Sequence, residues 1–149
     1  MIYKSTRGLA PEMSISRAII KGIAEDGGLY VPERFPQLSC DWEALGKLAY
    51  KELAKEVLRG YLDNFSEEEL NYCIDGAYTG RFEAEEIVPV VSAGGAYFAE
   101  LYHGPTAAFK DMALSLMPYL LTTSIKKEGE EKTVVILVST SGDTGMAAL

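Results

Sequence analysis

The chain has 149 residues, enough for one domain of ordinary size. Apolar residues make up 48% of it and charged residues 24%, a balance that argues against an intrinsically disordered or fibrous protein. A net charge of −8 argues against a protein that binds nucleic-acid phosphates or presents a polybasic patch to a membrane.

No segment of the sequence resembles a membrane span or a secretion signal. The longest strictly aliphatic run is Val134-Val-Ile-Leu-Val138, far short of the roughly 20 residues that a spanning helix needs. The amino terminus lacks the apolar core of a signal peptide. Cys40 and Cys73 are too few for a disulfide framework, so we expect two reduced core thiols. We therefore expect a cytoplasmic protein.

The first half of the chain is predicted to be mainly helical, because apolar residues recur at helical spacing between clear stop signals. The expected helices cover 14–24, run from a cap at Asp41 to Gly60, and run from a capping box of Ser66 and Glu69 to Gly76 and Gly80. The apolar side of the third helix consists of Leu70, Cys73, Ile74 and Ala77.

Strand signals begin after residue 84. Residues 87–91 and 96–99 are predicted to be two strands around a Gly94-Gly95 turn. A long helix is expected over 107–127, and Pro118 should kink it or remove one hydrogen bond. The apolar run 133–139 is typical of a strand buried on both faces of a parallel sheet, and a loop at 140–145 and a new helix follow it.

These elements predict an α/β protein with a mostly helical amino-terminal subdomain, 1–83, followed by the start of a parallel-sheet domain, 84–149. The chain stops where a strand–loop–helix unit has just begun its helix. We therefore expect an amino-terminal piece of a longer protein, with the edges of 133–139 exposed and open to self-association. A small complete α+β domain is the alternative.

Lys110 is the first candidate for chemistry, within His103-Gly-Pro-Thr-Ala-Ala-Phe-Lys-Asp111. On a helix beginning near residue 107 it would head an apolar stripe of Ala113, Leu114, Met117 and Leu121. Apolar surroundings and the positive end of a helix dipole both disfavour an ammonium group. A neutral amine can attack an aldehyde to form a Schiff base. The alternative is a surface lysine that extends its amine into water.

The second candidate is the loop Ser139-Thr-Ser-Gly-Asp-Thr-Gly145. It joins a predicted buried strand to a helix, which is where ligands bind in open α/β sheets. The hydroxyls of Thr140, Ser141 and Thr144 and the backbone N–H groups could bind a carboxylate or phosphate. Asp143 is itself an anion, and a simple helix-capping turn is the alternative. His103 is the only histidine, so this chain alone builds neither a Ser-His-Asp triad nor a multi-histidine metal site.

Together these segments resemble the threonine synthase family. The resemblance begins at Tyr3-Lys-Ser-Thr-Arg-Gly8, continues through Gly22-Ile-Ala-Glu-Asp-Gly-Gly-Leu-Tyr-Val-Pro-Glu33, and is greatest in the 103–111 and 140–145 motifs. The motifs occur in the family's order over nearly the whole chain. The resemblance implies an enzyme with a tryptophan synthase β-like fold that depends on pyridoxal 5′-phosphate (PLP). It also implies a chain about three times longer than this one.

By that resemblance, Lys110 matches the lysine that binds PLP covalently, and Phe109 and Asp111 flank it. Asp143 falls where the family's loop meets the cofactor's 3′-oxygen, and Thr140, Ser141 and Thr144 match positions near the substrate carboxylate. Residues for the cofactor's phosphate and ring nitrogen lie further along the family's chain. We therefore expect the 149 residues alone to bind PLP weakly and to be inactive.

The implied reaction converts O-phospho-L-homoserine and water to L-threonine and phosphate. Two alternatives stay open. One is a related PLP-dependent phospho-lyase that releases phosphate without making threonine. The other is a non-enzymatic module in which residues 1–83 serve in assembly.

Overall fold

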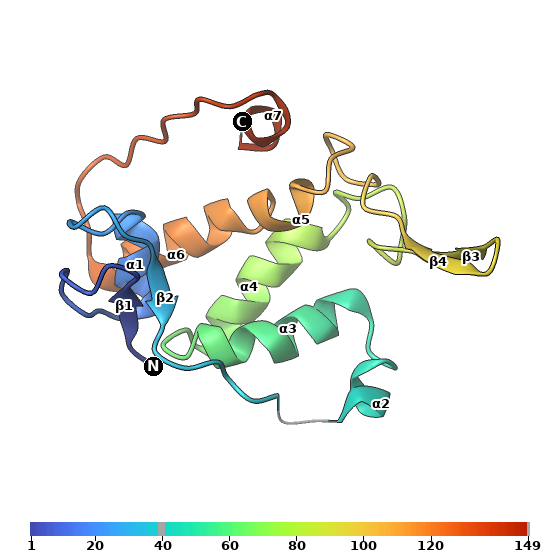
Figure 1. The fold of residues 1–149 in the computed structure, drawn as a ribbon, viewed down its shortest axis with the longest axis horizontal. Coiled ribbons are helices and arrows are strands. Elements are labelled where there is room, and N and C mark those ends of the chain that lie inside the picture. Colours follow the sequence, from blue (N-terminus) through green and yellow to red (C-terminus); the bar gives the residue numbers. More distant parts are fainter. Residues whose placement is uncertain (39–40, 149) are drawn as a thin grey trace.

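A computed structural model of the chain describes residues 1–38 and 41–148. Helices dominate these residues (Figure 1). The helices are α1 (Ile15–Lys21), α2 (Trp42–Leu45), α3 (Tyr50–Tyr61), α4 (Glu67–Tyr78), α5 (Asp111–Leu114), α6 (Met117–Glu128) and α7 (Asp143–Ala148). The strands are β1 (Tyr3–Ser5), β2 (Tyr30–Pro32), β3 (Val90–Ala93) and β4 (Ala96–Ala99). Cys40 lies outside the described residues.

The core forms where α4 crosses α6, with α3 packed on α4 and α1 packed on α6 (Figure 1). Its buried members come mostly from α4 and from the segments that flank it: Leu62, Leu70, Cys73, Ile74, Ala77, Tyr78, Ile87 and Leu116. The Cys73 thiol is free and buried, as predicted, and burial raises its pKa.

Helix α4 begins as the sequence predicts. The Ser66 hydroxyl accepts a hydrogen bond from the Glu69 backbone N–H (3.2 Å), and the Glu69 carboxylate accepts one from the Ser66 N–H (2.8 Å). The predicted apolar side is buried. The predicted stop at Gly76 is wrong, because the helix continues to Tyr78. Gly76 instead allows a close helix crossing, since a Cβ there would collide with the Tyr119 ring of α6.

The single helix predicted from Asp41 to Gly60 is also wrong. Asp41 does cap a helix, and its carboxylate accepts from the Ala44 N–H (2.7 Å), but α2 ends at Leu45. Gly46, a poor helix former, follows as the C-cap residue. The chain becomes helical again at Tyr50 and continues through Gly60 to Tyr61.

The Gly94-Gly95 hairpin is confirmed, with Val90 paired to Ala99 and Ala93 to Ala96. Its first strand begins at Val90 rather than at residue 87, because Ile87 has a positive φ of 67° that interrupts extended backbone. The hairpin projects away from the helices (Figure 1). Strand β1 pairs with β2, and both two-stranded sheets in the described residues are antiparallel.

The helix predicted over 107–127 is two helices. Helix α5 begins only at Asp111 and ends at Leu114, and α6 begins at Met117 with Pro118 in its first turn. Proline has no N–H to donate, so it favours a helix start over a helix interior. The predicted stripe below Lys110 is therefore divided between two helices.

The strand predicted over 133–139 is wrong for the described chain. These residues are exposed and pair with no strand among those described. A parallel strand needs neighbours that are distant in sequence, and the described residues supply none. The segment crosses above α6 as an extended trace that ends at α7 (Figure 1). Among the described residues, no helix has the length and apolar character needed to cross a membrane.

Candidate functional site

A short ordered loop leads into the residue of greatest interest, Lys110. The carboxylate of Asp111 accepts hydrogen bonds from both the Thr106 N–H (2.9 Å) and the Thr106 hydroxyl (2.6 Å). Asp111 is only 2% exposed. Gly104 lies so close to this carboxylate that a Cβ at position 104 would collide with it. The loop 104–111 therefore folds back onto the Asp111 carboxylate.

Ala107 lies inside this loop with a φ of 55°. An alanine in the left-handed region costs roughly 1–2 kcal/mol relative to a right-handed conformation. The surrounding hydrogen bonds hold it there, including one from the Ala107 N–H to the Gly104 carbonyl (3.0 Å). Such strained positions occur often at functional sites.

Lys110 is the N-cap residue of α5, and its side chain is half-buried. Its Nζ lies 5.1 Å from the centroid of the Phe109 ring, whose own exposure is 59%. The lysine is therefore neither deeply buried nor extended freely into solvent. Its position at the start of a helix agrees with the sequence prediction, although that helix begins at Asp111 and has only one turn.

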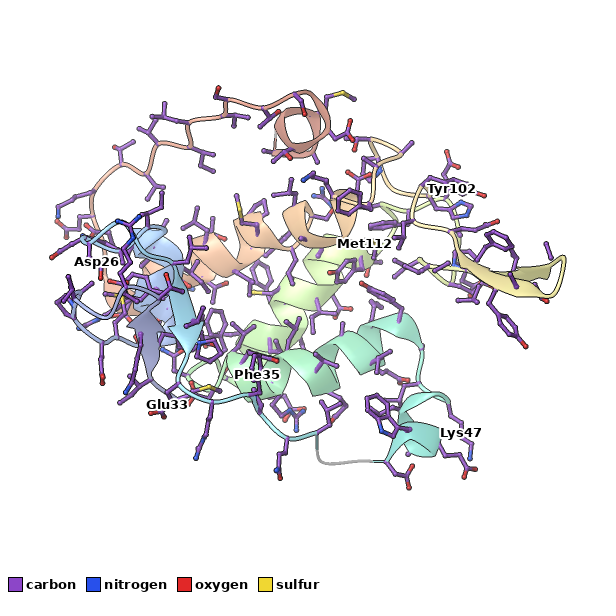
Figure 2. All side chains as sticks on the ribbon, viewed as in Figure 1. Asp26, Glu33, Phe35, Lys47, Tyr102 and Met112 are labelled. Carbon is purple, nitrogen blue, oxygen red and sulfur yellow. The ribbon has the colours of Figure 1, made fainter. Side chains whose placement is uncertain are left out.

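A tyrosine at the end of α4 forms a hydrogen bond with α5. The Tyr78 hydroxyl donates to the Met112 carbonyl oxygen (2.7 Å). Met112 lies near the end of α4 (Figure 2). Tyr78 is 6% exposed, and its ring packs edge-on against Tyr50 with centroids 5.1 Å apart. Burial, with a smaller effect of Tyr50, raises the pKa of Tyr78, so the hydroxyl stays a donor.

His103 begins the motif and contacts acidic and aromatic neighbours. Its Nε2 lies 2.8 Å from a Glu100 carboxylate oxygen, and its ring contacts the Tyr102 ring in a tilted arrangement with centroids 4.6 Å apart. The hydrogen bond from His103, with one from Tyr102, holds the pKa of Glu100 below its ordinary value. These contacts make His103 a hydrogen-bonded residue at the base of the hairpin.

The second motif has the geometry of a helix-capping turn. The Thr140 hydroxyl oxygen accepts from the N–H groups of Gly142 (3.2 Å) and Gly145 (3.0 Å). Ser141 and Asp143 are exposed, and Asp143 stands in the first turn of α7. This turn is the alternative that the sequence left open, and a substrate role for Thr140, Ser141 and Thr144 stays a prediction.

The helices that follow the two motifs are neighbours, because α5 packs against α7. A cavity of about 280 Å³ lies between them. Thr106 and Asp111 line it from the first motif, and Met146 and Ala147 line it from α7. Segments separated by some 30 residues in sequence therefore share one side of the molecule.

Sequence reasoning identified Lys110 and its flanking residues but missed Tyr78 and the closing role of Asp111. The Thr106–Asp111 spacing of five residues was a visible signal, since a threonine and an aspartate can close a loop of that length. Tyr78 gave no such signal, because its partner Met112 is 34 residues away.

These features define an α/β protein whose half-buried lysine begins a short helix, and a closed loop and a buried tyrosine both hydrogen-bond to that helix. Comparison with known sequences identifies the family within this class of protein. Residues 2–78 match the profile of the family described as "Threonine synthase N terminus", and the chain belongs to this family.

Relatives extend the match over the whole chain. The chain is 39% identical to threonine synthase of Methylobacillus glycogenes, over 99% of this chain and 33% of that protein. It is 40% identical to human threonine synthase-like 2, over 100% of this chain and 31% of that protein. The chain thus spans about a third of the length of these relatives.

Solved structures agree with this placement. PLP-bound threonine synthase from Brucella melitensis superposes with a TM-score of 0.85 at 37% identity, over 99% of this chain and 32% of that one. The yeast threonine synthase structure gives a TM-score of 0.84 at 34% identity, with the same coverage of both chains.

Proposed function

We propose that these residues form the amino-terminal third of a PLP-dependent threonine synthase, which converts O-phospho-L-homoserine and water to L-threonine and phosphate. The observation that carries the proposal is the placement of Lys110 in a held loop, within a chain that resembles a PLP-bound threonine synthase over 99% of its length. The proposed division is an amino-terminal subdomain, 1–83, and the beginning of the catalytic domain, 84–149.

The residues present fit one side of PLP. A half-buried primary amine suits the cofactor's carbonyl carbon, and Lys110 supplies it. The exposed Asp143 and the hydroxyls of Ser141 and Thr144 are donors or acceptors suited to a polar cofactor and an amino-acid substrate. We assign Lys110, Phe109 and Asp143 to the cofactor, and Thr140, Ser141 and Thr144 to the substrate carboxylate.

When bound, PLP stores the negative charge that develops as a substrate C–H bond breaks. The amine of Lys110 can accept the proton from the substrate Cα and return protons later. For this its Nζ must stay within reach of the reacting carbon, which depends on the closed 104–111 loop. The short α5 and the Asp111 contacts hold the backbone of Lys110 for that role.

The proposed partners are a small-molecule substrate and the remainder of the longer polypeptide. We further propose a cytoplasmic protein, and that the exposed segment 133–139 promotes self-association when nothing covers it. Neither nucleic acid nor membrane is a proposed partner.

The test uses the full-length gene product that contains these residues. Wild-type protein should show the absorbance band of covalently bound PLP, and Lys110→Ala should abolish it. Lys126→Ala, which removes an exposed lysine from α6, serves as the control and should retain the band. An unchanged band in Lys110→Ala would place the attachment elsewhere.

A related PLP-dependent phospho-lyase remains the second candidate. The chain is as similar to threonine synthase-like 2 (40%) as to the named threonine synthase (39%), so similarity alone does not fix the reaction. Assay of the full-length protein with O-phospho-L-homoserine decides between them. Threonine with phosphate supports the synthase, whereas 2-oxobutyrate without threonine supports the lyase.

A further inference from the structure

A backbone carbonyl near Lys110 lacks its ordinary helical partner. In an unbroken helix the Leu116 N–H would donate to the Met112 carbonyl, four residues earlier. Here it donates to the Ala113 carbonyl instead (3.2 Å), because the chain tightens between α5 and α6. Met112 is half-buried against the core, so its carbonyl oxygen is partly shielded from water and gains from another donor.

The Tyr78 hydroxyl is that donor, at 2.7 Å. It comes from the last residue of α4, a helix whose apolar side is packed in the core and cannot shift easily. The ring is fixed further by Tyr50 at 5.1 Å and by Phe82 at 5.9 Å. The hydrogen bond therefore connects a rigid helix to a single turn that begins directly after Lys110.

The other side of that turn is held independently by Asp111 and Thr106. With only this contact, α5 could still pivot about its first residue. With both contacts, the start and the middle of the turn are fixed, and so is the direction in which the Lys110 side chain leaves the backbone.

We propose that Tyr78 is a positioning residue for Lys110, and that its hydroxyl sets the orientation of the lysine through the Met112 carbonyl. This inference rests on the proposed function, because it assumes that the lysine reacts with PLP. Tyr78 acts on the lysine through the backbone and does not itself contact substrate.

A matched control exists elsewhere in the chain. Tyr3 is 4% exposed, and its hydroxyl donates to the Tyr61 carbonyl at 2.8 Å. Tyr3→Phe thus removes the same kind of bond from an equally buried ring, but from β1 rather than from the helix next to Lys110. Stability should fall similarly in both variants, so any excess effect in Tyr78→Phe concerns Lys110.

The experiment compares wild type, Tyr78→Phe and Tyr3→Phe in the full-length gene product. The first readout is the rate at which PLP attaches covalently to Lys110. It is measured by borohydride reduction and peptide mass measurement. We expect a roughly tenfold slower rate in Tyr78→Phe and less than a twofold change in Tyr3→Phe. The second readout is amide hydrogen exchange in residues 111–117, which should quicken only in Tyr78→Phe. In turnover, kcat should fall with little change in KM.

Equal rates in the two phenylalanine variants would overturn the inference. If Tyr78→Phe does not fold, Tyr78→4-aminophenylalanine replaces it, because that side chain keeps an N–H donor. This variant should attach PLP at close to the wild-type rate, and a tenfold loss would contradict a hydrogen-bonding role. A wild-type protein that attaches no PLP at Lys110 would instead refute the proposed function, which keeps the two failures distinct.

Discussion

A single buried carboxylate organises the loop in front of Lys110. The two oxygens of Asp111 serve different donors, one accepting from the Thr106 N–H and the other from its hydroxyl. Asparagine has nearly the same shape but only one acceptor oxygen, and its NH₂ group would face a donor. We expect Asp111→Asn to lower the free energy of unfolding by about 1–3 kcal/mol.

Urea denaturation of the purified protein measures this loss. Asp143→Asn is the control, because Asp143 is exposed on α7 and its replacement should change stability little. If Asp111→Asn unfolded at the same urea concentration as wild type, the stability of the loop would not depend on the carboxylate.

The sequence indicates the proposed reactive residue more readily than it indicates the surroundings of that residue. Lys110 was identified from its own motif, where the relevant neighbours are adjacent in the chain. The attachment of its helix to Tyr78 depends on a contact between α4 and α5 that spans 34 residues. Propensity and periodicity describe short segments, so they cannot specify such a contact.

Among the elements, the attachment of α1 to α6 is unusually polar. The Glu128 carboxylate at the end of α6 accepts from the buried Ser16 hydroxyl and from Arg17 Nε (2.8 Å). Asn64 in turn donates to Ser16 (2.7 Å). The Ser16 hydrogen bond, followed by that from Arg17, lowers the pKa of Glu128 from its ordinary value of 4.5.

A lowered carboxylate pKa makes the stabilisation depend on pH. The contribution is fully present above the unfolded pKa and is lost as pH falls through the folded one. We expect Glu128→Gln to destabilise the protein by about 1–2 kcal/mol at pH 7, with the difference from wild type shrinking below about pH 4. Thermal unfolding at several pH values measures the stability difference between Glu128→Gln and wild type. A stability difference that is independent of pH would contradict the charge-based explanation.

The success of each element prediction depended on where its stabilising contacts lie. Helix α4 was predictable because its capping box and apolar side are encoded within a few residues of each other. The hairpin was predictable for the same reason, since Gly94 and Gly95 both adopt positive φ in its turn. The 133–139 strand was not, because a parallel strand exists only through neighbours far away in the chain. The start of α6 beside Pro118 also has a local signal, because proline favours a helix start over a helix interior.

At the scale of the whole molecule, two segments with exposed apolar residues lie outside the helical core. The segment 133–138 and both strands of the hairpin are exposed, whereas α4 and its neighbours are closely packed. Figure 1 shows the segment and the hairpin on different sides of the helices. In the longer relatives, two thirds of the chain lies outside the matched region. The exposed apolar residues are therefore where we propose that further chain would pack.

If nothing covers the segment, copies of this chain should associate through it. Leu137 within it is 90% exposed, so Leu137→Lys places a charge in the proposed contact and should weaken association at least several-fold. Leu9 is 86% exposed near the amino terminus, so Leu9→Lys is a control of equal charge and similar exposure. Sedimentation velocity over a concentration series of the 149-residue chain measures the effect. Equal association in both variants, or a wild-type chain that stays monomeric, would show that the exposed run is not an adhesive surface.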